Sequence, residues 1–173
     1  ILLAFGVGMV SLLMLSKKQI KDQFVRNIKD IDLVLGAKGS PLQLILANVY
    51  QIDAPTGNID LEDAMEVTKH PYVESAIPLA YGDNYMGYRI VGTDHSYPQH
   101  YSAEISKGVM WSEIYEVTVG AVAADKMGLS IGDTFYSAHG LTDGTDVHDN
   151  VEFKVVGILK RTSSVIDLSL IHI

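Results

Sequence analysis

The feature that most limits how this chain can fold is the uncharged, mostly apolar run at its start, Ile1 to Leu15. As an α-helix this run would be about 22 Å long, shorter than the roughly 30 Å hydrocarbon core of a membrane. Because the chain begins with Ile rather than Met, we interpret residues 1–15 as the end of a first membrane helix that starts before the printed sequence.

Two other interpretations of this run stay open. The apolar part of a signal peptide is normally followed by a small-residue cleavage site, whereas Lys17 and Lys18 follow here. A buried core helix usually has a polar face, and the only polar side chain before Leu15 is that of Ser11. Both features favour the membrane helix.

Residues 16–31 change to a pattern of helical periodicity. Ile20, Phe24 and Ile28 recur every four residues among charged and amide side chains, which predicts an amphipathic stalk helix over 16–31. No Gly or Pro occurs between Leu12 and Leu35, so we expect the apolar and amphipathic parts to form one uninterrupted rod.

Five basic residues accompany this stalk: Lys17, Lys18, Lys21, Arg26 and Lys29. The positive-inside rule would place such a cluster in the cytoplasm, but the rule weakens when a long translocated domain follows. We therefore interpret the lysines as groups that reach lipid headgroups where the helix leaves the membrane. Membrane lipid is the expected neighbour of residues 1–18.

Residues 32–167 are predicted to form one folded domain that opens with short elements. Gly36, Gly39 and Pro41 separate two apolar runs. The first run, at 33–35, is expected to be a strand, and the second, at 42–50, a short helix or a second strand.

A helix and a hairpin are expected next. Asp60 is a suitable N-cap for the helix that follows it, and Pro71 would end that helix. From Val73 the apolar and polar residues alternate, which indicates a β-hairpin with its turn at 82–84.

The rest of the domain alternates strands and loops. We expect an aromatic-rich loop over 95–101, strands over 116–120, 133–138 and 151–161, a helix over 121–127 ended by Gly128, and a polar loop over 140–150. Val155, Val156 and Ile158 make the last strand almost continuously apolar, so it should be buried on both faces. Strands outnumber helices without a regular βαβ order, which favours an α+β fold with a mixed or antiparallel sheet and short helices.

Charge and composition exclude several classes of function. The formal net charge is -8, and a negative field repels phosphate, so nucleic acid is not an expected partner. The chain has no cysteine, which excludes disulfides, thiolate metal sites and cysteine nucleophiles.

Histidines and carboxylates give two weak metal candidates. His95 and His100 have no carboxylate at a ligand spacing. A richer loop contains His139, Asp143, Asp146, His148 and Asp149. It lacks the D-x-D-x-D-G pattern and the bidentate Glu of an EF-hand, so we interpret it as a solvated turn and predict no metal ligand.

Catalytic motifs are equally weak. The sequence has no G-x-S-x-G or S-x-x-K motif, and Ser40 lies in a turn between Gly39 and Pro41. In residues 36–40 the lysine precedes the second glycine, the wrong order for a phosphate-binding loop. We therefore predict no catalytic residue, no cofactor and no enzymatic activity.

Aromatic side chains gather in the middle of the chain. They are Tyr81, Tyr85, Tyr88, Tyr97, Tyr101 and Trp111. Amphipathic aromatics favour interfaces, so these residues could line a ligand groove or a partner surface, and they could equally form a half-buried edge of the core.

Two blocks of sequence together resemble a known family. The first is residues 32–59, directly after the amphipathic segment, and the second is residues 117–135, followed by the strand at 151–159. The second block contains a V-x-G turn, an Ala-rich helix, a G-L-x-x-G-D turn and an F-x-V-V-G-I strand. This order is similar to that of the large outer domain of MacB/FtsX-like ABC transporter permeases. Residues 168–173 depart from the pattern and are left without a role.

The resemblance implies a non-catalytic periplasmic core domain in the bacterial inner membrane, with residues from about 32 onward outside the cytoplasm. Such permeases pair as homodimers or heterodimers and engage a cytoplasmic ATP-binding cassette ATPase. Their outer domains transmit ATP-driven motion or handle cargo, sometimes with a periplasmic adaptor.

Two alternatives remain at this point. The chain could be a single-pass anchored adaptor or ligand-binding module that presents Tyr85, Tyr97 and Trp111. It could also be an anchored metal-dependent hydrolase that uses the loop from His139 to Asp149.

Overall fold

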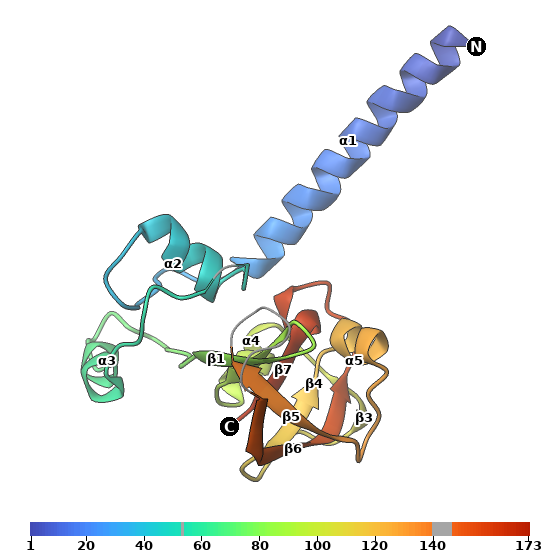
Figure 1. Ribbon diagram of the computed structural model, residues 1–173. Coiled ribbons are helices and arrows are strands. Elements are labelled where there is room, and N and C mark those ends of the chain that lie inside the picture. Colours follow the sequence, from blue (N-terminus) through green and yellow to red (C-terminus); the bar gives the residue numbers. More distant parts are fainter. Residues whose placement is uncertain (53, 140–146) are drawn as a thin grey trace. The chain divides into compact units, whose positions relative to one another are not determined.

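The computed structural model describes residues 1–52, 54–139 and 147–173, and of residues 139 and 147–150 only the backbone. The chain divides into two compact units, Ile1–Leu33 and Val34–Ile173. Each unit is described by itself below, with the element labels of Figure 1.

The first unit is a single helix, α1, which runs without interruption over Leu2–Asn27. The expected continuity of the apolar and amphipathic parts is therefore confirmed. The expected extension of the stalk helix to residue 31 is wrong, because α1 ends at Asn27 and Asp30 has a φ of 58°. Aspartate is among the few residues that tolerate this left-handed conformation, which a continuing α-helix cannot contain.

The second unit begins with a helical segment, defined here as residues 34–72. It contains α2, Pro41–Asn48, and α3, Leu61–Thr68. The Ser40 side chain caps α2 by accepting from the Gln43 backbone N–H at 3.5 Å. Of the two alternatives expected for 42–50, a short helix or a second strand, the structure therefore has the helix. Asp60 caps α3 as predicted. Residues 33–35 do not form the expected strand.

The predicted hairpin is present, but its turn lies elsewhere. Strand β1 covers Ala80–Tyr85 and β2 covers Tyr88–Gly92, so the turn residues are Met86 and Gly87, with φ values of 50° and 80°. A two-residue turn with two positive φ angles matches the twist of the paired strands. Residues 82–84, the expected turn, lie inside β1 where its register shifts.

Within the described residues, seven strands form the sheet of the second unit. The remaining five are β3, Ile105–Gly108; β4, Glu116–Val119; β5, Thr134–His139; β6, Val147–Leu159; and β7, Ser169–His172. Their order is β3-β6-β4-β7-β2-β1-β5, and an additional β5–β6 pairing joins both ends of the run from β6 to β5. These six strands therefore close into a barrel, to which β3 is attached through β6 (Figure 1). The α+β class with a mixed sheet is as expected.

The expected end of the domain at residue 167 is wrong, because the segment at 168–173, which was left without a role, contributes a strand to the barrel. Ser169–His172 form β7, which pairs with β2 on one side and β4 on the other, and Leu168 ends η1. Leu170 and Ile171 are completely buried. The domain therefore continues past residue 167. A four-residue strand gives little local signal, since its place depends on partners far away in the chain.

The barrel interior holds one of two apolar clusters. Its buried members are Ile90, Val117, Val119, Ala123, Ala124, Phe135, Phe153, Val155 and Leu170. The two alanines come from helix α5, Ala121–Met127, which has the predicted bounds and ends at Gly128 with a φ of 69°.

The second cluster lies on the outer face of the strands. Its buried members are Val91, Tyr97, Trp111, Leu159, Ile166 and Ile171. Ile90 and Val91 belong to different clusters, as do Leu170 and Ile171, because successive strand residues point to opposite faces. Tyr97 comes from helix α4, Ser96–His100, where a loop was expected, and Ile166 from the 3₁₀-helix η1, Val165–Leu168.

Two glycines of the family-like pattern lie directly against backbone. A Cβ added at Gly120 would lie 2.2 Å from the Ile166 carbonyl oxygen, and one at Gly157 would lie 2.0 Å from that of Val109. Neither residue has a positive φ. Both positions therefore require glycine for close approach of two backbone segments.

We expect Gly120→Ala to lower the free energy of unfolding by about 3 kcal/mol, because the backbone of η1 must move to admit the methyl group. Urea unfolding followed by Trp111 fluorescence measures this. Gly82→Ala is the matched control, since a Cβ there meets nothing within 4 Å, and it should cost less than about 1 kcal/mol. Equal effects at the two positions would contradict the close-approach explanation.

Candidate coupling site between the helical segment and the barrel

A polar network joins the helical segment to the barrel at Gln51, three residues after the end of α2. The Gln51 side-chain amide donates to the Tyr97 hydroxyl at 2.8 Å, and its amide oxygen accepts from the Ser169 hydroxyl at 3.0 Å. Tyr97 is 3% exposed and Ser169 is completely buried. One side chain thus bonds to α4 and β7 at once.

Arg89 of β2 completes this network from the barrel side. Its Nε donates to the Gln51 backbone oxygen at 3.1 Å, and its guanidinium carbon lies 5.6 Å from the centre of the Tyr81 ring. The Tyr81 hydroxyl in turn donates to the Asn48 backbone oxygen at 3.3 Å. Gln51, Arg89, Tyr97, Ser169 and Tyr81 are called the Gln51 junction from here on.

Gln51 also has an unusual backbone, with a φ of 54°. A left-handed conformation is uncommon for a residue other than glycine and persists when its surroundings hold it. Here the bonds to Tyr97, Ser169 and Arg89 supply that restraint. The junction therefore holds the chain after α2 in one conformation against α4, β7 and β2.

Burial keeps the tyrosines of this region neutral. Desolvation raises the pKa of Tyr97 and of Tyr81 well above the ordinary tyrosine value, although the charge of Arg89 partly opposes the effect at Tyr81. Burial also raises the pKa of Tyr101 to about 12. At neutral pH all three hydroxyls are therefore available as hydrogen-bond donors.

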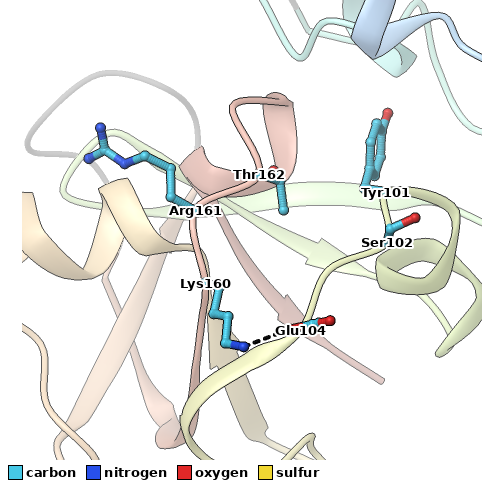
Figure 2. Close-up of a pocket in the computed structure, with 6 residues that line it drawn as sticks. All are labelled: Tyr101, Ser102, Glu104, Lys160, Arg161 and Thr162. Carbon is cyan, nitrogen blue, oxygen red and sulfur yellow. Dashed lines mark hydrogen bonds and ion pairs between the residues drawn. The ribbon is translucent and has the colours of Figure 1, made fainter.

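A pocket of about 260 Å³ lies on another part of the domain (Figure 2). Its lining residues are Tyr101, Ser102, Glu104, Lys160, Arg161 and Thr162. Lys160 Nζ lies 2.6 Å from Glu104 Oε2 and lowers the pKa of that carboxyl group, and Arg161 pairs with Asp125 at 3.8 Å. Since both cations already have carboxylate partners, we assign no ligand to this pocket.

The first metal candidates have structural roles. His95 Nε2 lies 3.0 Å from the Trp111 carbonyl oxygen, and the His100 ring packs edge-on against Tyr101. In residues 1–52, 54–138 and 151–173, whose side chains the structure describes, no group of three His, Asp or Glu side chains could hold a metal. Asp143 and Asp146 lie outside the described residues.

The other three residues of this second metal candidate are His139, His148 and Asp149, and the structure describes only their backbone. The prediction for the loop from His139 to Asp149 therefore stays a prediction.

The possible phosphate loop at 36–40 forms the entrance to α2. Ser40 is its N-cap, and a Cβ at Gly39 would lie 2.6 Å from the Thr56 methyl carbon. The hydroxyl group is therefore used to cap a helix, and the glycine is needed for packing against Thr56.

The aromatic residues belong to the core or its edge. Trp111 is 1% exposed, Tyr97 is 3% exposed, and the Tyr85 ring stacks on Phe135 at 4.5 Å. The interpretation of Tyr97 and Trp111 as a partner surface is therefore wrong, because their rings fill the outer apolar cluster.

Sequence reasoning did not single out Gln51, Arg89 or Ser169. One local signal was available for Arg89, which is a charged residue inside the otherwise apolar run Tyr88–Gly92. Buried charged groups need partners, so this pattern could have indicated a polar network. Nothing near Gln51 or Ser169 in the sequence indicates that they meet, since 118 residues separate them.

We expect Gln51→Ala to lower the free energy of unfolding by about 2 kcal/mol, because it leaves the buried hydroxyls of Tyr97 and Ser169 without this partner. Backbone amides of residues 44–50 should also exchange hydrogen faster. Gln99→Ala, at an exposed position of α4, is the control and should change stability by less than about 0.5 kcal/mol. Matching effects in the two variants would argue against a holding role for Gln51.

Alkaline pH is expected to destabilise the domain. The unfolded tyrosines ionise near pH 10, whereas burial raises the pKa of Tyr81, Tyr97 and Tyr101 in the folded state. Their contribution is therefore complete below about pH 9 and is lost as the pH rises from about 10 through 12. Urea unfolding at a series of pH values measures it, and a stability that stays constant to pH 12 would contradict the assignment.

Comparison with known proteins places this sequence in a family. Residues 1–171 match the family described as MacB-like periplasmic core domain. Among solved structures, the periplasmic region of MacB from Actinobacillus actinomycetemcomitans is similar, with 14% sequence identity, a TM-score of 0.48, and coverage of 84% of this chain and 69% of that one. No curated protein matches the sequence. The chain belongs to the MacB-like periplasmic core domain family and is such a domain of an ABC transporter permease.

Proposed function

We propose that this domain lies outside the cytoplasm at the bacterial inner membrane, where it transmits ATP-driven motion within the permease or handles its cargo. The observation that carries the proposal is α1, a single 26-residue helix whose apolar start continues directly into a basic, amphipathic end. This helix immediately precedes the folded unit of the family domain. The proposed role is non-catalytic.

The length and composition of α1 suit a membrane anchor. Its 26 residues correspond to about 39 Å of helix, and the helix is long and apolar enough to cross a membrane. The apolar side chains from Leu2 to Leu15 are largely exposed in the chain itself, as expected for groups that contact lipid. Lys17 and Lys18 would then lie among headgroups.

The route for motion runs through the chain that follows α1. Residues 28–40 are not helical, so displacement of α1 must pass through this connection to α2. The Gln51 junction then fixes the end of α2 to β2, β7 and α4. A fixed junction of this kind supports transmission, because a displacement of the helical segment would carry the barrel with it.

The proposed partners follow from membership in a permease family. A cytoplasmic ATP-binding cassette ATPase would supply the motion, and a second permease copy, identical or related, would complete the transporter. A periplasmic adaptor or a cargo molecule would contact the domain. The chemistry of the cargo is not part of the proposal.

We expect insertion of Gly-Gly after Gln23 to abolish transport by the full permease in reconstituted vesicles while ATP hydrolysis continues. Two glycines interrupt the stiff helix with residues of poor helix propensity. An Ala-Ala insertion at the same place is the matched control, because it has the same length and rotational offset but preserves the helix. The Ala-Ala variant should retain more transport than the Gly-Gly variant.

Two outcomes would count against the transmission role. Unchanged transport in the Gly-Gly variant would reject the transmission role. Equal loss in both variants would show that spacing, and not stiffness, matters, and would also count against it. Loss of folding is checked by the urea unfolding curve of the purified variant, which should match that of the original chain.

A further inference from the structure

Strand β3 forms an open edge of the sheet. Within the described residues it pairs with β6 alone, whereas β5, at the other end of the strand order, is also joined to β6. The Glu104 carbonyl oxygen and the Val109 backbone N–H, on either side of β3, bond to the backbone of residues 156–160. Backbone groups alternate in direction along a strand, so others in β3 point away from β6. Such an edge can pair with an extended segment of another chain.

A groove of about 580 Å³ lies beside this edge. Ser106 and Lys107 of β3 line it, and so do Ala121, Ala124 and Gly128 at helix α5. The three residues at α5 are small, so the space between the helix and the strand stays open. Side chains alternate between the two faces of a strand. A segment paired with β3 would therefore place every second side chain on the side of the groove.

Part of the groove lining is apolar. Leu129 and Ile158 are half-buried, and Ile131 is 44% exposed. Apolar side chains at alternate positions of a bound segment would remove these groups from water.

The charge of the groove differs from that of the domain around it. Residues 34–173 contain eight basic and 18 acidic residues. Three of the basic ones, Lys107, Lys160 and Arg161, line the groove, where the acidic lining residue is Asp125. The carboxylate pairs of Lys160 and Arg161 are largely exposed and therefore weak, and among the described residues no ion pair involves Lys107. The groove is a basic site in an acidic domain, so it favours an anionic segment.

The same charges argue against two other occupants. Pairing β3 with β3 of a second copy would bring two Lys107 side chains together, and like charges on neighbouring strands are destabilising. An anionic lipid headgroup would supply charge but no backbone to pair with the strand edge.

We propose that β3 and this groove bind an extended acidic segment of a partner protein. The backbone of the segment pairs with β3, its carboxylates face Lys107, Lys160 and Arg161, and its alternate apolar side chains lie against Leu129 and Ile158. The inference goes beyond the proposed function, because it names a binding surface and the chemistry of its ligand. It does not require that the domain transmits motion.

A synthetic peptide of alternating Glu and Val tests the proposal. Fluorescence anisotropy of the labelled peptide with the full chain in neutral detergent should show saturable binding. Backbone amides of residues 105–108 should exchange hydrogen more slowly when the peptide is bound. The corresponding peptide of alternating Lys and Val should not bind, because its charge is reversed.

Two methylated peptides test whether the backbone pairs with β3. In a strand, the Glu N–H groups of this peptide point to one edge and the Val N–H groups to the other. One peptide is N-methylated at the Glu residues and the other at the Val residues. Both keep the charge, but only one keeps the N–H groups that pair with β3, so their affinities should differ about ten-fold.

A pair of lysine variants locates the site. Lys107→Glu should weaken binding of the Glu-Val peptide about ten-fold. Lys126→Glu is the matched control, because it makes the same charge change at an exposed position of α5 that does not line the groove, and it should change the affinity less than about two-fold. Urea unfolding curves check that both variants fold.

Several results would overturn the inference. They are absence of saturable binding, equal effects of the two lysine variants, and equal affinity of the two methylated peptides. Slow exchange of amides 105–108 without peptide, if it depends on protein concentration, would show that a second copy covers the edge. Protection of these amides by phosphatidylglycerol in the micelles, and not by the peptide, would show that lipid does. Binding is measured without ATP, so its failure would leave the transmission role untouched.

Discussion

Closure of the barrel through β6 is the constraint on which the rest of the folded unit depends. β6 pairs with β5 along its first part and with β4 and β3 along its last part, so one long strand joins both ends of the six-strand run. Closure creates an interior that buries one residue set and an outer face that buries another. Both sets use the same strands, because neighbouring residues point to opposite sides.

The outer face gives this barrel its connection to the rest of the chain. α4, η1 and the residues after α2 all lie against it, and the Gln51 junction adds directional bonds to the apolar packing. Apolar contacts alone would allow small displacements, whereas a side chain bonded to two buried hydroxyls fixes one position. The close approach at Gly120 likewise fixes η1 against the start of α5.

Elements with strong local signals could be predicted from sequence. The apolar start of α1, the Asp60 cap and the helix Ala121–Met127 with its Gly128 C-cap all follow from spacing and capping chemistry within a few residues. β7 could not be predicted, because its short apolar run forms a strand through pairing with β2 and β4, which lie far away in the sequence.

The hairpin turn and the coupling site were harder for related reasons. Met86 has no special turn propensity, whereas the Gly-Asp-Asn stretch at 82–84 has a strong one, so the local signal favoured the wrong place. Gln51 and Ser169 meet across 118 residues.

The most direct test of rigid coupling is an electron-spin resonance distance measurement in the full permease. The two spin labels are placed at Leu42→Cys in α2 and at Ile114→Cys, between β3 and β4. One narrow distribution, unchanged between nucleotide-free and ATP-bound states, is predicted, and a broad or shifted distribution would contradict rigid coupling through the Gln51 junction.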